Sequence, residues 1–315
     1  ETTSGAVLGA FTAAQLAKLD TKVIKVLSAD DLKKFTATEF KLSDAQQDVL
    51  TATQVNGLDA DHVNALTIEK LSSKLIKGLG DSSTALAALS DDNVAKLTGD
   101  QLKVMTAGQF KQLITDARAD LSKLDATAVG SITPAQLKAL ASSTDTGGWG
   151  TDSTTGIRAK FGETIADAFT ELQTAKLSPA ELLALQPKLK PTLGTITDGA
   201  VADTSAKAET FSDVTGQFTA ADTQTTPKTD GFTYKLTGSK TSTETGFNLS
   251  KAGAFGTFYL NSTDGSYKYV AKATAVDALA KDATGKDSFE VFASNRGIDS
   301  DAGTINFDIT GEDEA

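Results

Sequence analysis

The stretch that decides the fold of the first part of the chain reads LSADDLKKF, at residues 27–35. Ser28 is a good N-cap, and Asp31 stands three positions later, where it completes a capping box. Leu27 before the cap and Leu32 after it are spaced to pack on each other as a hydrophobic staple. The stretch therefore predicts a helix of one to two turns, which ends where the next unit begins.

This unit recurs with a period of eight residues, which we treat as a genuine internal repeat. Its apolar positions are Phe11, Leu19, Leu27 and Phe35, with a second column at Leu16, Ile24, Leu32 and Phe40, and later blocks at Leu42, Leu50, Leu58 and Leu66, at Leu89, Leu97, Met105 and Leu113, at Leu124, Ile132 and Leu140, and at Phe169, Leu177, Leu185 and Leu193. A coiled coil would repeat every seven residues, and one long helix would not need a new N-cap in each unit. Because helices this short are unstable alone, we expect a solenoid of short capped helices over residues 1–193, with a break at about 141–160.

After about residue 210 the period of the apolar residues changes from eight to two. The predicted strands are residues 216–220, 232–236, 246–249, 255–260, 267–270, 288–292 and 304–309, and a short helix is predicted at 275–280. Asp264-Gly265 is a strong hairpin signal between two of the strands. The pattern predicts an immunoglobulin-like β-sandwich at 211–315, joined through a linker at 194–210. The whole chain is thus predicted to be a multi-domain α+β protein.

Both parts of the chain resemble known bacterial sequences. The octads are similar to short Leu-[Ser/Thr]-x-x-Gln repeats in very large secreted and surface proteins. The second part resembles VCBS-type repeats through GTFYLN at 256–261, DGSYKY at 264–269, AVDAL at 275–279, DSFEV at 287–291 and ITGEDEA at 309–315. The resemblance implies a cadherin-like sandwich of the kind strung in tandem in bacterial adhesins, many of which bind calcium. The chain departs from that pattern at residues 223–226 and 312–314, where the usual acidic run and the commoner Asn-Asp are replaced.

The composition excludes several classes of function. With no Cys and a single His, the chain has no thiol chemistry, no Cys-based metal site and no multi-histidine site. Its net charge of −11 argues against nucleic acid as a partner. No apolar run is long enough for a transmembrane helix. No catalytic constellation stands out, so we expect a protein that is not an enzyme.

Calcium is the cofactor that the sequence suggests, because acidic residues lie in Gly-rich turns. Asp299 and Asp301 form a D-x-D-x-G run, and Glu312 and Asp313 stand at the end of the module. Asp222 and Asp287 are further candidate ligands by the VCBS resemblance. The alternative is that these residues belong to ordinary solvated turns.

Two further segments are candidate partner contacts. Trp149, the only Trp, lies in the Gly/Ser/Thr-rich break, where it either binds a partner or sugar ring or fills the join between two repeat blocks. Val7 and Leu8 belong to an apolar segment before the first full octad, which either covers the first unit or inserts into a neighbouring subunit by strand addition.

These observations predict an extracellular structural protein of a bacterial surface: a self-assembling fibre, surface-layer or adhesin subunit, stabilised by calcium. Its partners would be identical subunits or neighbouring modules of one long chain. Two alternatives stay open: a module that binds surface glycans or a host ligand, and an accessory region of a secreted hydrolase.

Overall fold

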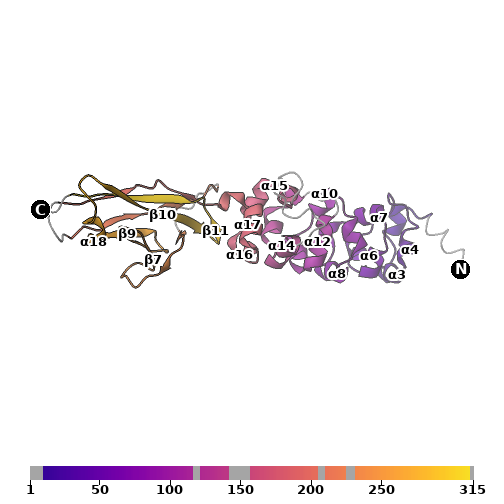
Figure 1. The fold of residues 1–315 in the computed structure, drawn as a ribbon. Helices are drawn as coiled ribbons and strands as arrows, with labels where there is room; N and C mark the ends of the chain where they lie inside the picture. Colours follow the sequence, from indigo (N-terminus) through magenta and orange to yellow (C-terminus); the bar gives the residue numbers. More distant parts are fainter. Residues whose placement is uncertain (1–9, 116–120, 142–156, 205–209, 225–230, 313–315) are drawn as a thin grey trace. The chain divides into compact units, whose positions relative to one another are not determined.

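A computed structural model describes residues 10–115, 121–141, 157–204, 210–224 and 231–312. The chain divides into two compact units, Glu1–Leu185 and Gln186–Ala315, which we call the helical unit and the strand unit (Figure 1). The predicted mixed α+β class is confirmed. The division falls at residue 185 rather than near 193. The segment 194–210, predicted as a linker, contains a strand of the strand unit, Gly199–Ala202.

The helical unit consists of short helices. They are α2 (Ala13–Leu16), α3 (Thr21–Val26), α4 (Ala29–Leu32), α5 (Asp44–Gln47), α6 (Ala52–Asn56), α7 (Ala60–Asn64), η1 (Ile68–Lys70), α8 (Ser73–Gly78), α9 (Thr84–Ala87), α10 (Asp91–Val94), α11 (Gly99–Val104), α12 (Ala107–Thr115), η2 (Leu121–Lys123), α13 (Ala126–Gly130), α14 (Pro134–Ala141), α15 (Ile157–Ala168), α16 (Glu171–Thr174) and α17 (Pro179–Leu185). α15 is interrupted at Gly162, whose φ of 71° lies in the left-handed region that glycine tolerates.

Helix capping explains why the helices are short. The predicted capping box is present at Ser28, whose hydroxyl accepts from the Asp31 N–H at 3.0 Å while the Asp31 carboxylate accepts from the Ser28 N–H at 3.2 Å. Full boxes also begin α2, α5, α6, α11 and α16. In most units the new cap starts a helix before the previous one has grown beyond two turns; α12, α14 and α15, with 9, 8 and 12 residues, are longer.

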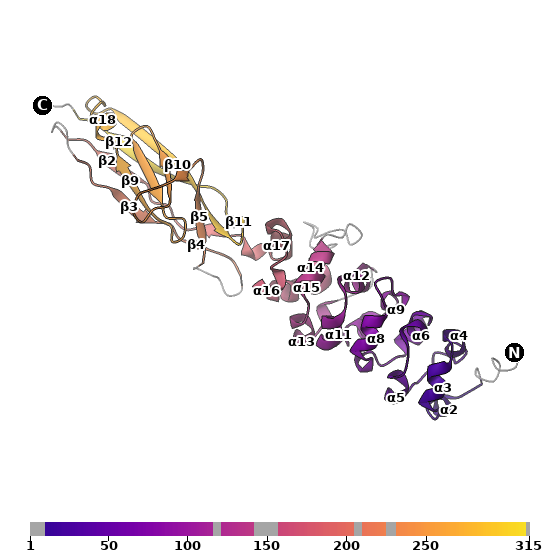
Figure 2. The same cartoon turned by 90° about the horizontal axis from the view of Figure 1, so that it is seen from below.

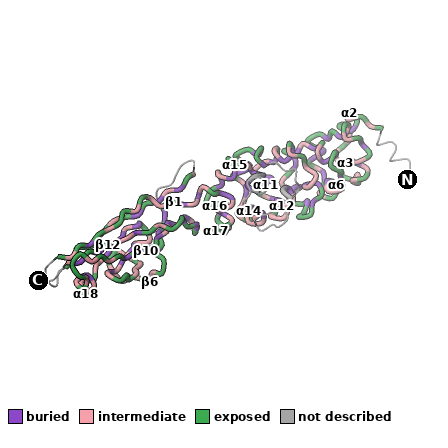
Figure 3. Tube along the Cα trace, turned by 45° about the horizontal axis from the view of Figure 1, so that its top comes forward, coloured by how far each residue is buried: buried purple, intermediate pink, exposed green. Residues whose placement is uncertain are grey.

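Packing joins helices that lie two or three elements apart. α4 contacts α6, α6 contacts α8 and α9, α11 contacts α8 and α13, and α14 contacts α12 and α16. The chain therefore returns beside itself after about 30 residues, and we call each such stretch a tier (Figure 2). The second apolar column of the repeat, Leu16, Ile24, Leu32 and Phe40, is fully buried in the shared core. Figure 3 shows buried and exposed positions alternating closely along this unit.

The strand unit has two five-stranded sheets and one short pair. Its elements are η3 (Pro187–Leu189), β1 (Thr192–Leu193), β2 (Gly199–Ala202), β3 (Val214–Gln217), β4 (Ala220–Ala221), β5 (Thr233–Leu236), β6 (Lys240–Thr241), β7 (Leu249–Ala252), β8 (Gly256–Leu260), β9 (Ser266–Ala271), α18 (Ala273–Val276), β10 (Thr284–Asn295), β11 (Ile298–Asp299) and β12 (Gly303–Thr310). One sheet has the order β11-β10-β12-β2, with β5 also on β10, and the other has the order β3-β9-β8-β7-β6. β2 pairs with β12 in parallel, whereas the other pairs are antiparallel.

The two five-stranded sheets share one aromatic core. Phe258 of β8 stacks on Phe289 of β10 at 4.9 Å between ring centroids, and Tyr269 of β9 stacks on Phe307 of β12 at 4.2 Å. Each of the seven predicted strands overlaps or adjoins an observed one. The strands β1, β2, β6 and β11 were not predicted. β1, β6 and β11 have only two residues, which are too few for alternation to show, and β2 lies in the predicted linker and consists of small residues and one valine.

Candidate functional site

Buried polar side chains link each tier of the helical unit to the tier before it. We call these the bridging residues: Gln46, Gln54, His62, Asn93, Gln101, Gln109, Gln136 and Gln173. All are less than a tenth exposed. Each stands at the third position of its helix, the position that closes the capping box.

Gln101 shows the geometry of a bridge. Its Oε1 accepts from the Thr98 N–H at 2.9 Å, which closes the capping box of α11. Its Nε2 donates to the carbonyls of Ile68 and Leu71, 33 and 30 residues earlier, at 2.8 and 2.7 Å. One buried amide therefore satisfies a helix start in one tier and two carbonyls in another.

The sequence had indicated the caps but not the bridges. A capping box needs only an acceptor at the third position, so Glu or Asp would suffice. The repeated choice of Gln is the signal that a donor is also needed there.

His62 occupies a bridging position in place of Gln. Its Nδ1 lies 2.7 Å from Asp59 Oδ1, its Nε2 lies 2.8 Å from the Phe35 carbonyl, and its ring packs edge-on against Phe40. Both partners are acceptors, and each ring nitrogen that carries a proton can donate to the partner it faces. The hydrogen bond from His62 is the main reason that the pKa of Asp59 is lowered.

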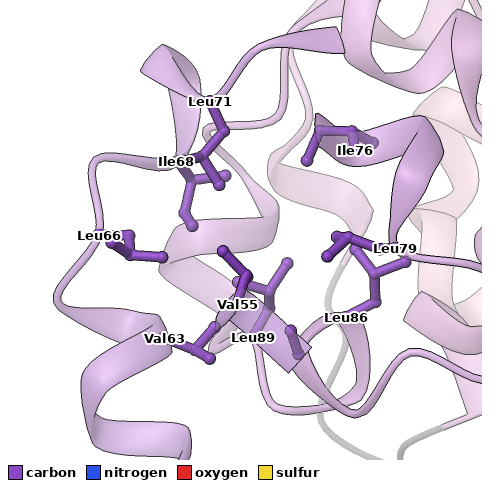
Figure 4. Close-up of a pocket in the computed structure, with 10 residues that line it drawn as sticks. Val55, Val63, Leu66, Ile68, Leu71, Ile76, Leu79, Leu86 and Leu89 are labelled. Atoms are coloured by element: carbon purple, nitrogen blue, oxygen red, sulfur yellow. The ribbon is translucent and has the colours of Figure 1, made fainter. Parts of the chain in front are cut away.

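A gap in the core of the helical unit is too small for a ligand. Figure 4 shows this gap, where side chains such as Val55, Ile68, Ile76 and Leu86 converge. The free space is about 10 Å³, at the lower limit of what one water molecule occupies. Its lining is entirely apolar, so this space is part of the packed core.

In the strand unit, the predicted calcium ligand Asp287 has a structural position. It is buried on β10 and accepts from the N–H groups of Ala254 and Phe255, at 2.7 and 3.0 Å, and from the Tyr269 hydroxyl at 2.7 Å. Burial, followed by the contact with Asp287, raises the pKa of Tyr269 and keeps it a donor. Asp287 thereby joins β10 to β9 and to the turn before β8.

Asp299 and Asp301 are each paired with a lysine. Asp299 accepts from Lys235 Nζ at 2.7 and 2.9 Å, and Asp301 accepts from Lys190 Nζ at 2.8 Å. Burial opposes ionisation of Asp299, but the hydrogen bonds from Lys235 and Ser294 outweigh it and lower its pKa. The lysines neutralise the charge that a calcium ion would need.

The remaining predicted ligands lie elsewhere. Asp222 is buried after β4, and its Oδ1 accepts from the Gln224 N–H at 3.3 Å. Glu312 pairs with Lys281 near the end of the chain. Within the described residues no three acidic or histidine side chains gather to hold a metal ion.

Four of the predicted site residues lie outside the described residues. They are Trp149, Val7, Leu8 and Asp313. Their partner and metal roles stay predictions from the sequence.

The surface of the strand unit is hollowed between β3 and residues 195–199. This groove has a volume of about 280 Å³ and is lined by residues 195–199, residues 214–218 and Tyr267. Asp198 accepts from the Asn306 N–H and side-chain amide at 2.8 and 3.0 Å, which lowers its pKa. The groove is polar and open, and it runs beside the free edge of a sheet.

No helix in the described ranges is long and apolar enough to cross a membrane. No protein-family model and no curated protein matches the chain. The function must therefore be argued from the arrangement of the residues themselves.

Proposed function

We propose that the chain is a structural protein of a bacterial surface, a self-assembling subunit of a fibre, surface layer or adhesin. In this proposal the helical unit is a solenoid, and the strand unit is an immunoglobulin-like sandwich of the VCBS type. Its activity is assembly and spacing rather than turnover.

The observation that carries the proposal is the set of bridges between tiers. The same contact recurs at five glutamines. In each, the side-chain amide nitrogen lies 2.7–3.1 Å from two main-chain carbonyl oxygens of an earlier tier; the five are Gln46, Gln54, Gln101, Gln136 and Gln173. A stack of this kind gains length by adding equivalent tiers. The buried polar groups are used to hold the stack together, as a spacer requires.

The topology of the strand unit supports the sandwich and its surface role. Two sheets enclose one aromatic core, and β2 crosses to pair in parallel with the last strand. The resemblance to VCBS repeats associates this arrangement with exported bacterial proteins, and a chain without Cys suits such a setting.

Light scattering at increasing protein concentration tests the proposal, with electron microscopy of the largest particles. The measurement is made in millimolar calcium and then in chelator. We expect particles that grow with concentration into regular fibres or sheets. A 32.6 kDa monomer at every concentration in both buffers would refute self-assembly. If the particles grow equally in both buffers, self-assembly stands and a role for calcium in it is refuted.

A further inference from the structure

The free edge of β3 has main-chain groups directed away from its own sheet. Phe218 N–H donates to the Gly265 carbonyl, so this residue pair is hydrogen-bonded across β3 and β9. Bonded and non-bonded pairs alternate in an antiparallel ladder. In the observed register Gly216 bonds to Tyr267, and Thr215 and Gln217 turn their N–H and C=O groups outward.

One neighbouring segment covers this edge only in part. Gly194 N–H donates to the Thr219 carbonyl at 2.8 Å, which occupies the next outward position along the edge. Residues 195–199 then run toward β12, with which Gly199 begins to pair as part of β2. In the described structure no main-chain hydrogen bond joins residues 195–199 to β3. The groove of about 280 Å³ lies between residues 195–199 and β3, and it leaves room beside Thr215 and Gln217.

The opposite edge of the same sheet differs. β6 is only two residues long and carries the exposed Lys240. Short edges and lysines are common devices that prevent strand pairing between molecules. β3 is four residues long and contains neither a charge nor a proline. The sheet therefore carries these protecting devices at β6 but not at β3, where the only cover in the described structure is the partial one from residues 194–199.

We propose that β3 is the surface through which two copies of this chain associate. Antiparallel pairing of β3 with itself about a two-fold axis is self-complementary, because Thr215 and Gln217 of each copy face the same residues of the other. The strand unit has more acidic than basic residues, so like-charged copies meet most easily at an uncharged edge.

This inference rests on the proposed self-assembly. The first test places a lysine on each edge in turn, Thr215→Lys on β3 and Thr241→Lys on β6. The two positions are matched: both threonines are exposed, and both turn their main chain outward, since Ser242 N–H bonds to Asn248 in the ladder of β6 with β7. We expect Thr215→Lys to weaken association at least about tenfold, by charge repulsion between paired edges, and Thr241→Lys to leave it unchanged. Melting curves establish that both variants are folded.

A second test uses the absence of cysteine in the chain. Thr215→Cys and Gln217→Cys proteins, mixed under mild oxidation, should form a disulfide-linked dimer because paired strands bring Cα atoms within about 5–6 Å. Thr241→Cys is the control and should stay monomeric on a denaturing gel.

The outcomes separate the two proposals. If the unaltered chain never associates, self-assembly fails and this inference fails with it. If it associates but Thr215→Lys associates equally well and the cysteine pair does not cross-link, self-assembly stands and the β3 interface is wrong.

Discussion

At the scale of single residues, a glutamine at the third helical position makes two kinds of contact. Its oxygen completes a cap within the octad, and its amide nitrogen reaches an earlier tier. The first tier shows the difference: Gln15 closes the cap of α2 and is exposed, whereas Gln101 is buried and also donates to Ile68 and Leu71.

This difference predicts unequal effects for the same substitution. Gln101→Leu leaves the Leu71 carbonyl and the Thr98 N–H without the partners that Gln101 supplies, while the Ile68 carbonyl keeps only the Leu71 N–H, and it should lower the free energy of unfolding by about 2–4 kcal/mol. Gln15→Leu removes only an exposed cap contact and should cost less than about 1 kcal/mol. Urea denaturation followed by circular dichroism measures both, and equal losses would contradict the bridging role.

The contact between His62 and Asp59 predicts a dependence of stability on pH. His62 Nδ1 lies 2.7 Å from Asp59 Oδ1, and this hydrogen bond favours the ionised carboxylate and lowers the pKa of Asp59. On the acid side the lowered pKa of Asp59 means that its contribution is present above the unfolded carboxyl pKa and is lost as pH falls through the folded value.

His62→Gln supplies the matched variant, since Gln is the usual bridging residue. Thermal melting as pH falls from about 5 to about 2 should show a loss of stability that is larger in the unaltered chain than in the variant, because the variant lacks the imidazole that lowers the pKa of Asp59. Identical profiles would show that the contact with His62 does not couple ionisation of Asp59 to folding.

At the scale of elements, Asp287 holds two strands and a turn together. Asp287→Ala leaves the N–H groups of Ala254 and Phe255 and the hydroxyl of Tyr269 without their acceptor, so the strand unit should lose about 3–5 kcal/mol of stability. Asp308→Ala is the control, because its ion pair with Lys286 is exposed and long at 3.5 Å and should contribute less than about 1 kcal/mol. Denaturation in calcium and in chelator should give the same loss. A loss seen only with calcium would instead make Asp287 a metal ligand.

Contacts between residues close in the sequence could be predicted, whereas contacts between residues far apart in the sequence could not. Ser28 and Asp31 are three positions apart, so their capping box could be predicted from a single repeat unit. The strands β8 and β9 alternate clearly and are joined by a short turn at Asp264-Gly265. The acceptors of Gln101 lie about 30 residues away, and the partner of Asp287 on β9 lies 18 residues earlier. No local pattern encodes those pairings, and for the same reason the sequence did not indicate the lysine partners of Asp299 and Asp301.

At the scale of the molecule, the two units have separate cores. We expect residues 10–185 and 186–315 to fold when expressed separately, because each buries its own apolar residues. Their summed circular dichroism and their dispersed NMR spectra should match those of the whole chain. A fragment that gives only a collapsed spectrum would show that it needs the other unit to fold.

The bridges also constrain how such a chain can change its length during evolution. Removing a single octad would place the amides of each bridge that spans the deletion beside the wrong carbonyl, whereas duplicating about 30 residues would preserve each pairing. Extra residues are harmless only between bridges: Gln173 reaches back 44 residues to Val129, whereas Gln54 reaches back 30 to Ile24, yet both make the same contact. Related chains should therefore differ by whole tiers or by insertions between bridges, and the eight-residue period should persist on both sides.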